Sequence, residues 1–120
     1  MIPKVIFKYS EIYDKILERE NTYIQQSQKS REIKLSSKEI LNYILNIEEI
    51  WKKDEKAILI ELSKITFLKW KQEEIFCYIV KNSIPFSDPL TIPIYKKFPD
   101  YFIAIVKILY EPRIFLESMT

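Results

Sequence analysis

The sequence contains no glycine and no histidine, and each absence excludes a class of functional site. A Walker-type phosphate loop and the Rossmann fingerprint both need backbone positions that only glycine occupies freely, so nucleotide enzymes of these two classes are excluded. Without histidine there can be no Ser-His-Asp triad, no Cys-His pair and no imidazole ligand for a metal ion. We therefore expect no catalytic site, no metal site and no cofactor.

Cysteine is almost as scarce, because Cys77 is the only one in the chain. A single cysteine cannot form an internal disulfide, and the apolar neighbours in "EIFCYIV" predict a core residue without a base that could activate the thiol. This usage is typical of a reducing compartment, so we expect a cytoplasmic protein. No apolar run approaches the roughly 18 residues that a bilayer span needs, and we expect no membrane association.

Neither sign of charge is in excess, since 19 Lys and Arg face 17 Asp and Glu for a formal net charge of +2. Only three of the basic residues are arginines. A nucleic-acid module would show a clustered basic excess, so nucleic-acid binding is disfavoured although not excluded. The length and the apolar content predict one globular domain over residues 1–120. Richness in Ile, Lys and Glu is typical both of hyperthermophile proteins and of AT-rich genomes, and both origins stay open.

Apolar residues at three- and four-residue spacing predict the first helices. One runs over about 11–27, and a second starts at the Ser-x-x-Glu capping box that opens with Ser36. Asp54 could cap a further helix, and we favour a break near Lys53, while one bent helix over 37–65 is the alternative. We expect these helices to bury the following stripe residues: Ile12, Tyr13, Ile16, Leu17, Tyr23, Ile24, Ile40, Leu41, Ile44, Ile47, Trp51, Ile58, Leu62 and Ile65.

Alternating and β-branched residues predict strands over 4–9 and 74–80, and "LTIPIY" over 90–95 fits an edge strand because Pro93 cannot donate to a ladder. A last helix over about 98–111 follows, and the tail should dock through Ile114, Phe115 or Leu116. This element order predicts an α+β fold, a small mixed or antiparallel sheet of about three strands packed against about four helices. The expected buried face of the last helix is Phe102, Ile103, Val106, Leu109 and Tyr110.

The loop "NSIPFSDP" is the candidate interaction site. Prolines at 85 and 89 fix two φ angles, so an aromatic side chain on this loop would lose little entropy when a partner binds. The alternative is that the aromatic ring folds back into the core. The loop residues that we expect to contact a protein partner are Ile84, Pro85, Phe86, Ser87 and Asp88. Self-association through the strand at 90–95 is a second possibility.

Residues 70–111 follow an order of elements that ends in the helix "DYFIAIVKILYE", after a strand, a Ser-Asp-Pro loop and an edge strand. This block resembles the core of a zincin-type metallopeptidase domain. In that family the helix carries His-Glu-x-x-His, which supplies two zinc ligands and a general base. The matching positions here are Lys107, Ile108 and Glu111, so the resemblance implies a catalytically inactive domain with Lys107 and Glu111 facing a former groove. The alternative is an ordinary exposed ion pair on a helix.

Two short segments interleave aromatic residues with lysines, an arrangement that can stack bases while amines meet phosphates. The candidate nucleic-acid contacts are Lys69, Trp70, Lys71, Lys96 and Lys97. Nearby glutamates and the absence of arginine weaken this alternative, and the indole is better explained as part of the core edge. We therefore expect a non-catalytic interaction or regulatory module that binds a protein partner or itself.

Overall fold

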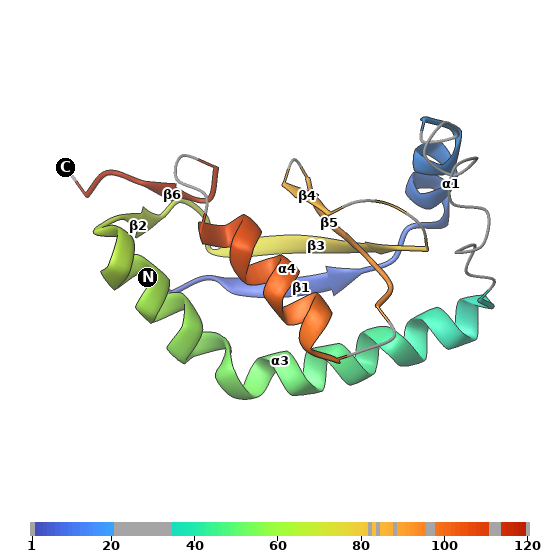
Figure 1. The fold of residues 1–120 in the computed structure, drawn as a ribbon, viewed down its shortest axis with the longest axis horizontal. Helices are drawn as coiled ribbons and strands as arrows, with labels where there is room; N and C mark the ends of the chain where they lie inside the picture. Colours follow the sequence, from blue (N-terminus) through green and yellow to red (C-terminus); the bar gives the residue numbers. More distant parts are fainter. Residues whose placement is uncertain are drawn as a thin grey trace.

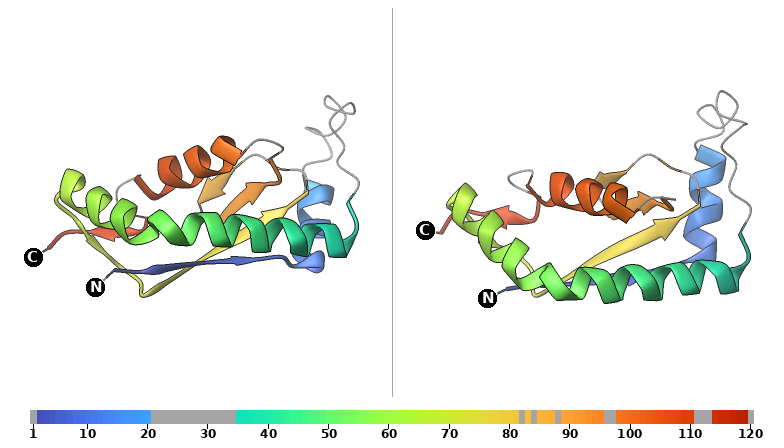
Figure 2. Two further views of the ribbon diagram at one scale, coloured as in Figure 1. Left: turned by 90° about the horizontal axis from the view of Figure 1, so that it is seen from below. Right: turned by 60° about the horizontal axis from the view of Figure 1, so that its bottom comes forward.

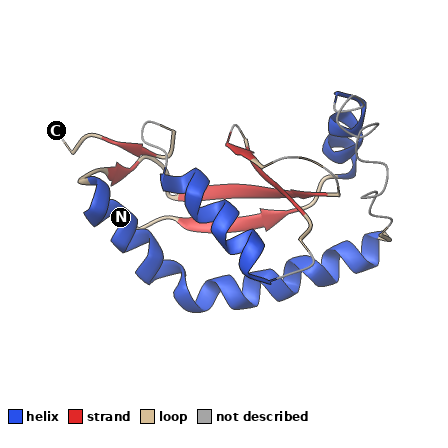
Figure 3. Ribbon diagram, in the orientation of Figure 1, coloured by secondary structure: helices blue, strands red, loops and turns tan. Residues whose placement is uncertain are grey.

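The computed structural model describes residues 2–20, 35–81, 83, 85–87, 89–95, 98–110 and 114–119, and the structural statements below concern these residues. They form a four-stranded sheet, a separate two-stranded sheet and three helices (Figures 1 and 3). The α+β class predicted from the sequence is therefore confirmed, but the prediction of about three strands and about four helices differs from the four strands of the larger sheet and the three helices of the described residues. In chain order the elements are β1 (Lys4–Lys8), α1 (Glu11–Glu20), α3 (Ser37–Thr66), β2 (Lys69–Trp70), β3 (Glu74–Val80), β4 (Phe86–Ser87), β5 (Leu90–Pro93), α4 (Phe98–Tyr110) and β6 (Leu116–Glu117).

The larger sheet is mixed and has the order β1-β3-β5-β4. Strands β1, β3 and β5 are parallel, and the two-residue β4 runs antiparallel to β5 at the edge. The register places Val5 beside Ile75 and Phe7 beside Cys77, so these alternate residues share one face of the sheet. All four are buried in the main hydrophobic core.

Helices α3 and α4 cover this apolar face, with α3 against β1 and α4 against β5 (Figure 2). Helix α1 lies at the carboxyl end of β1 and packs on the opposite face, because Tyr13 contacts Tyr78 and Thr91 there. Trp51 of α3 connects the sheet with α4, because it packs against Phe7 of β1 and Phe102 of α4. The distances between ring centroids are 6.3 Å to Phe7 and 5.7 Å to Phe102. The core thus lies between the sheet and the α3–α4 pair.

Helix α3 is continuous over 30 residues, so the predicted break near Lys53 is wrong and the single bent helix is right. Its start is as predicted: Glu39 N–H donates to Ser36 Oγ at 3.2 Å, and Glu39 Oε1 accepts from Ser36 N–H at 3.4 Å. No proline or glycine interrupts the segment, so Asp54 is accommodated inside the helix rather than capping a new one. Figure 1 shows the helix curving along β1.

The strand near residue 90 is not at the sheet edge, which corrects the prediction for 90–95. β5 lies between β3 and β4 because Phe86 and Ser87, expected in a loop, pair with Thr91 and Leu90. Pro93 has no N–H to donate, and none is needed towards β3. The neighbouring Ile94 N–H donates to the Val80 carbonyl of β3 at 3.0 Å, and because successive backbone nitrogens of a strand point in opposite directions, the Pro93 nitrogen faces away from β3. Strand β4 has only two residues, and the alternation of apolar and polar residues that predicts a strand can be recognised only over at least four.

The tail docks as expected, since Phe115 and Leu116 are buried and Ile114 packs against the core. Strand β6 pairs with β2, and the sequence predicted neither strand. Several stripe residues are exposed, contrary to prediction, because each helix buries a narrower stripe than its apolar residues cover. The residues predicted to be buried that are exposed are Ile12, Ile16, Leu41, Ile65, Ile103 and Tyr110. The predicted helix end at 21–27 lies outside the described residues.

Candidate functional site

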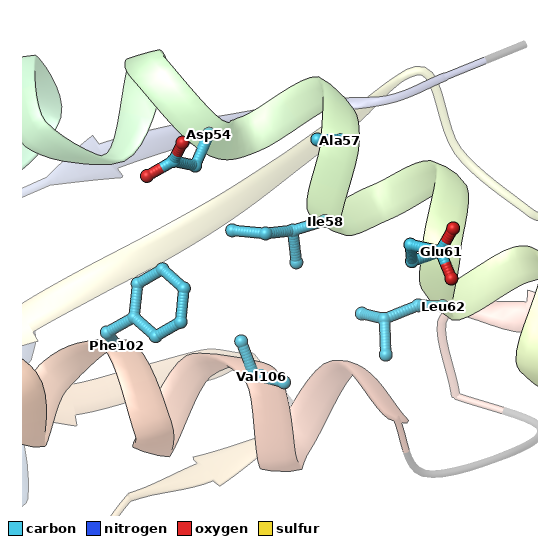
Figure 4. A pocket seen from close by; sticks show the side chains of 7 residues that line it. All are labelled: Asp54, Ala57, Ile58, Glu61, Leu62, Phe102 and Val106. Atoms are coloured by element: carbon cyan, nitrogen blue, oxygen red, sulfur yellow. The ribbon is translucent and has the colours of Figure 1, made fainter.

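The candidate site is an open groove between α3 and α4 with a volume of about 420 Å³. Figure 4 shows the two helices facing each other, with Ile58 and Leu62 on one wall and Phe102 and Val106 on the other. These apolar side chains are half-buried except for Leu62, which is buried. The full lining is Asp54, Ala57, Ile58, Glu61, Leu62, Phe102 and Val106.

The groove exists because small side chains stand where the two helices meet. Phe102 packs on Trp51 at one end and holds α4 against α3. One turn further along, Ala57 and Val106 offer little volume, so the helix surfaces do not close on each other. Apolar surface therefore stays open to solvent beside a packed core, which is the usual form of a docking groove for a protein segment.

The rim of the groove is acidic. Asp54 and Glu61 are both exposed on α3, seven residues apart, so they lie about two turns or roughly 10 Å from each other on one flank. Within the described ranges no ion pair joins either carboxylate to a basic side chain. The pKa of the Tyr101 hydroxyl is raised to about 12. Burial is the main cause, and the nearby Tyr43 and Asp54 add to it. An apolar floor beside two carboxylates favours an apolar ligand with positive charge.

The sequence alone does not reveal this groove. It allows Asp54 to be a helix cap, and it predicts that Ile58, Leu62 and Phe102 belong to the core. The one available signal was the i, i+7 spacing of Asp54 and Glu61 alongside an apolar stripe. That signal shows only that acids flank the stripe, and it does not show which part of the stripe another helix leaves uncovered.

The residues matched to the zincin motif do not line the groove. Lys107 is exposed on the same outward stripe of α4 as Ile103 and Tyr110, whereas Val106 faces the groove. Ile108 is half-buried against the core. Glu111 lies outside the described residues, so the ion pair expected with Lys107 is not described. The resemblance stays a prediction.

The candidate interaction loop is partly ordered as strand. Phe86 and Ser87 are half-buried in β4, and Pro85 is exposed. Phe86 is thus neither held out as an exposed tip nor fully folded into the core. Ile84 and Asp88 lie outside the part of the chain that the structure describes.

Of the two lysine-and-aromatic segments, the structure describes Lys69, Trp70 and Lys71. The Trp70 side chain is only 3% exposed, and its Nε1–H donates to the Leu59 carbonyl at 3.0 Å, so the indole is not available to stack on a base. Lys69 pairs with Glu117 at 3.8 Å, and Lys71 is exposed. Lys96 and Lys97 lie outside the described residues. The core-edge interpretation of the indole is therefore confirmed.

A polar cluster that the sequence analysis missed lies where β1 and β3 end. Asp14 of α1 is 1% exposed, yet Tyr9 O–H donates to its Oδ2 at 3.0 Å and Lys81 N–H donates to its Oδ1 at 3.2 Å. The Lys81 Nζ lies 3.9 Å from Asp14 and 3.8 Å from Glu18. Because both oxygens of the buried carboxylate have partners inside the protein, this cluster anchors α1 to the sheet rather than presenting a ligand site.

Other acidic and sulfur-containing side chains provide no metal site in the residues described. No three His, Cys, Asp or Glu side chains among them converge at a distance suited to an ion. Burial raises the pKa of the Cys77 thiol, so this side chain is an inert core residue, as predicted. Of the described helices, none combines the length and the apolar character that crossing a bilayer requires. No protein-family model, curated protein or solved structure matches the chain.

Proposed function

We propose that this protein works by binding rather than by catalysis, and that the α3–α4 groove receives a helical segment of a protein partner. The observation that carries the proposal is the open apolar floor of Ile58, Phe102 and Val106 beside the acidic pair Asp54 and Glu61. The segment that fits this groove is an amphipathic helix with two apolar side chains one turn apart and with Lys or Arg along its flank.

The size of the groove sets the strength of binding. Burying two aliphatic side chains contributes about 1.5 to 3 kcal/mol each, and immobilising two chains offsets part of this gain. The carboxylates at the rim add attraction that is screened by salt and that mainly favours a cationic partner over an anionic one. A single helix in this groove should therefore bind with a Kd of roughly 10 µM to 1 mM.

A designed peptide tests the proposal directly. The probe is an alanine-based helix that carries two leucines one turn apart and two lysines on the same face, and its matched control carries glutamates in place of the lysines. Isothermal titration should detect the lysine peptide at low ionic strength and not the glutamate peptide. Absence of binding by the lysine peptide, or equal binding of both, would contradict the proposed function.

Charge reversal on the protein provides the matched control. Glu61→Lys changes the rim, whereas Glu49→Lys makes the same change at an exposed position of α3 that does not line the groove. Glu61→Lys should weaken binding of the lysine peptide by about tenfold or more, because like charges then meet at the contact. Glu49→Lys should leave the affinity within about twofold. Equal effects of the two changes would indicate general electrostatic attraction and not a groove contact.

A further inference from the structure

Three apolar residues near the α3–α4 groove are exposed, although the sequence predicts each of them to be buried. Ile65 of α3 is 58% exposed, and Ile103 and Tyr110 of α4 are 50% and 48% exposed. None of the three is among the residues that line the groove. A single exposed apolar side chain is ordinary on a protein surface, whereas several that adjoin one another usually mark a contact surface.

Helix periodicity places these three residues directly beside the groove lining. Ile65 follows Leu62 by three residues, so the two are neighbours on the surface of α3. Tyr110 follows Val106 by four residues, and Ile103 precedes Val106 by three, so both are neighbours of Val106 on α4. Each exposed residue therefore adjoins a residue of the groove wall. We call Ile65, Ile103 and Tyr110 the apolar lip.

The lip lengthens both walls of the groove at the same end. Helices α3 and α4 run in the same direction, with their carboxyl ends towards the same side of the molecule (Figures 1 and 2). Phe102 packs on Trp51 at the opposite end of the groove. From Asp54 to Ile65 the α3 wall spans eleven residues, about 16 Å or three helical turns.

We propose that the helical segment of the partner makes a third apolar contact, with the apolar lip, and is therefore a helix of at least three turns. This inference rests on the proposed function of the groove. Two of its apolar side chains enter the groove, and the third lies seven residues from the first and covers Ile65 and Tyr110. Helices that bind in grooves use this spacing of apolar residues, because positions i, i+4 and i+7 share one face.

The charges beside the lip differ from those beside the groove. Asp54 and Glu61 are exposed along the first two turns of the α3 wall, whereas the exposed charged neighbours of the lip are Lys64 and Lys107. Within the described ranges neither lysine forms an ion pair. A base on the third turn of the partner helix would meet like charge there. The bases of the partner should therefore be confined to the two turns that face the groove.

Extended versions of the designed lysine peptide test this inference by isothermal titration at low ionic strength. A third turn without lysine is added at the amino end in one pair of peptides and at the carboxyl end in another pair. Within each pair, the apolar position of the added turn holds leucine or alanine. In one of the pairs the leucine peptide should bind about tenfold more tightly than its alanine control. No gain from leucine in either pair would overturn the inference.

Protein variants show whether the gain comes from the lip. In a variant that carries both Ile65→Ser and Tyr110→Ser the gain should vanish, while the affinity for the alanine peptide should stay within about twofold. The control carries Leu41→Ser and Leu45→Ser, which remove two similarly exposed apolar residues of α3 that do not line the groove, and it should keep the gain. All four positions are exposed, so both variants should stay folded, which circular dichroism checks. A gain that persists in the lip variant, or that the control also loses, would contradict the proposal.

Isoleucine methyl resonances give a second readout on the unmodified protein. The methyl signals of Ile65 and Ile103 should shift with the tighter leucine peptide and clearly less with its alanine control, whereas exposed Ile12 of α1 should not shift. If the Ile65 and Ile103 signals instead move with protein concentration in the absence of peptide, a second copy covers the lip and the inference is wrong.

Failure of this inference is distinguishable from failure of the groove itself. If the two-leucine lysine peptide binds but a third leucine adds nothing, the proposed function stands and only the contact with the lip is wrong. If none of the lysine peptides binds, both proposals fail.

Discussion

The indole Nε1–H of Trp51 donates a hydrogen bond of 2.6 Å to Glu55 Oε2, and the same oxygen accepts Val5 N–H at 3.3 Å. One carboxylate therefore satisfies a buried indole of α3 and a backbone donor on the outer edge of β1. This bridge fixes the long helix along the edge strand, and so it fixes the wall of the groove that begins at Asp54.

Replacing Glu55 by Ala should destabilise the fold by about 1 to 3 kcal/mol, because Trp51 Nε1–H would be buried without an acceptor. Glu55→Gln keeps an oxygen acceptor and should cost less. Urea unfolding measures both. Glu49→Ala, on the exposed surface of the same helix, is the control and should change the free energy of unfolding by less than about 0.5 kcal/mol. A Glu55→Ala variant as stable as that control would show that the bridge contributes nothing.

Stability should fall at alkaline pH through Tyr9. Burial, together with the hydrogen bond to Asp14, raises the pKa of the Tyr9 hydroxyl from 10.0 to about 12. Because the folded-state value is the higher one, the protonated hydroxyl favours the fold, its contribution is complete below pH 10, and it is lost as pH rises towards 12. Unfolding measured between pH 8 and 12 should show this loss. Tyr9→Phe should be less stable at pH 8 and should show a smaller decline, and an unchanged decline would contradict the assignment.

Phe67 is a site where substitution should stabilise the protein. It caps α3 in the left-handed conformation, with φ 57° and ψ 30°, and its ring is 81% exposed. This conformation costs a side-chain-bearing residue about 1 kcal/mol or more, and glycine adopts it freely, but the sequence has none to place there. Phe67→Gly should raise the free energy of unfolding by about 0.5 to 1 kcal/mol. Lower stability would instead indicate that the ring contributes packing.

The tail should be an integral part of the fold. Leu116 is fully buried in β6, paired across from Trp70 of β2. Leu116→Ala should therefore cost about 2 to 5 kcal/mol. Met119 is exposed three residues further on, and Met119→Ala provides a comparable truncation that should cost less than about 0.5 kcal/mol. Equal and small effects in thermal unfolding would show that β6 does not support the core.

Helices and strands with a regular spacing of apolar residues over many positions were predictable from the sequence. Their neighbours in the fold were not. The helix start at Ser36 and the strand at 74–80 follow from residues within a few positions of each other. Strand β5 is an interior strand because Phe86 and Ser87 pair with it. These two residues are too few to show the alternating pattern that predicts a strand. The continuity of α3 past Lys53 also escaped prediction, because Asp54 is compatible both with a cap and with a helix interior.

The candidate site was harder to predict because it depends on which apolar residues remain uncovered. Periodicity groups Ile12 with Leu17, yet Leu17 is buried and Ile12 is exposed. Likewise, the sequence shows Val106 only as an apolar residue of the last helix, whereas in the structure it lines the groove. Exposure depends on how helices distant in sequence pack together, and the sequence of one helix does not contain that information.

The measurement that tests the account most directly is a nuclear magnetic resonance titration of the labelled protein with the designed lysine peptide. If the groove is the binding site, the amide shifts should change along residues 54–62 of α3 and 102–106 of α4. At the same peptide concentration, these changes should be clearly smaller in Glu61→Lys and should keep their size in Glu49→Lys. Shifts confined to other surfaces, or no shifts at peptide concentrations up to about 1 mM, would contradict the claim that this groove binds a helical partner.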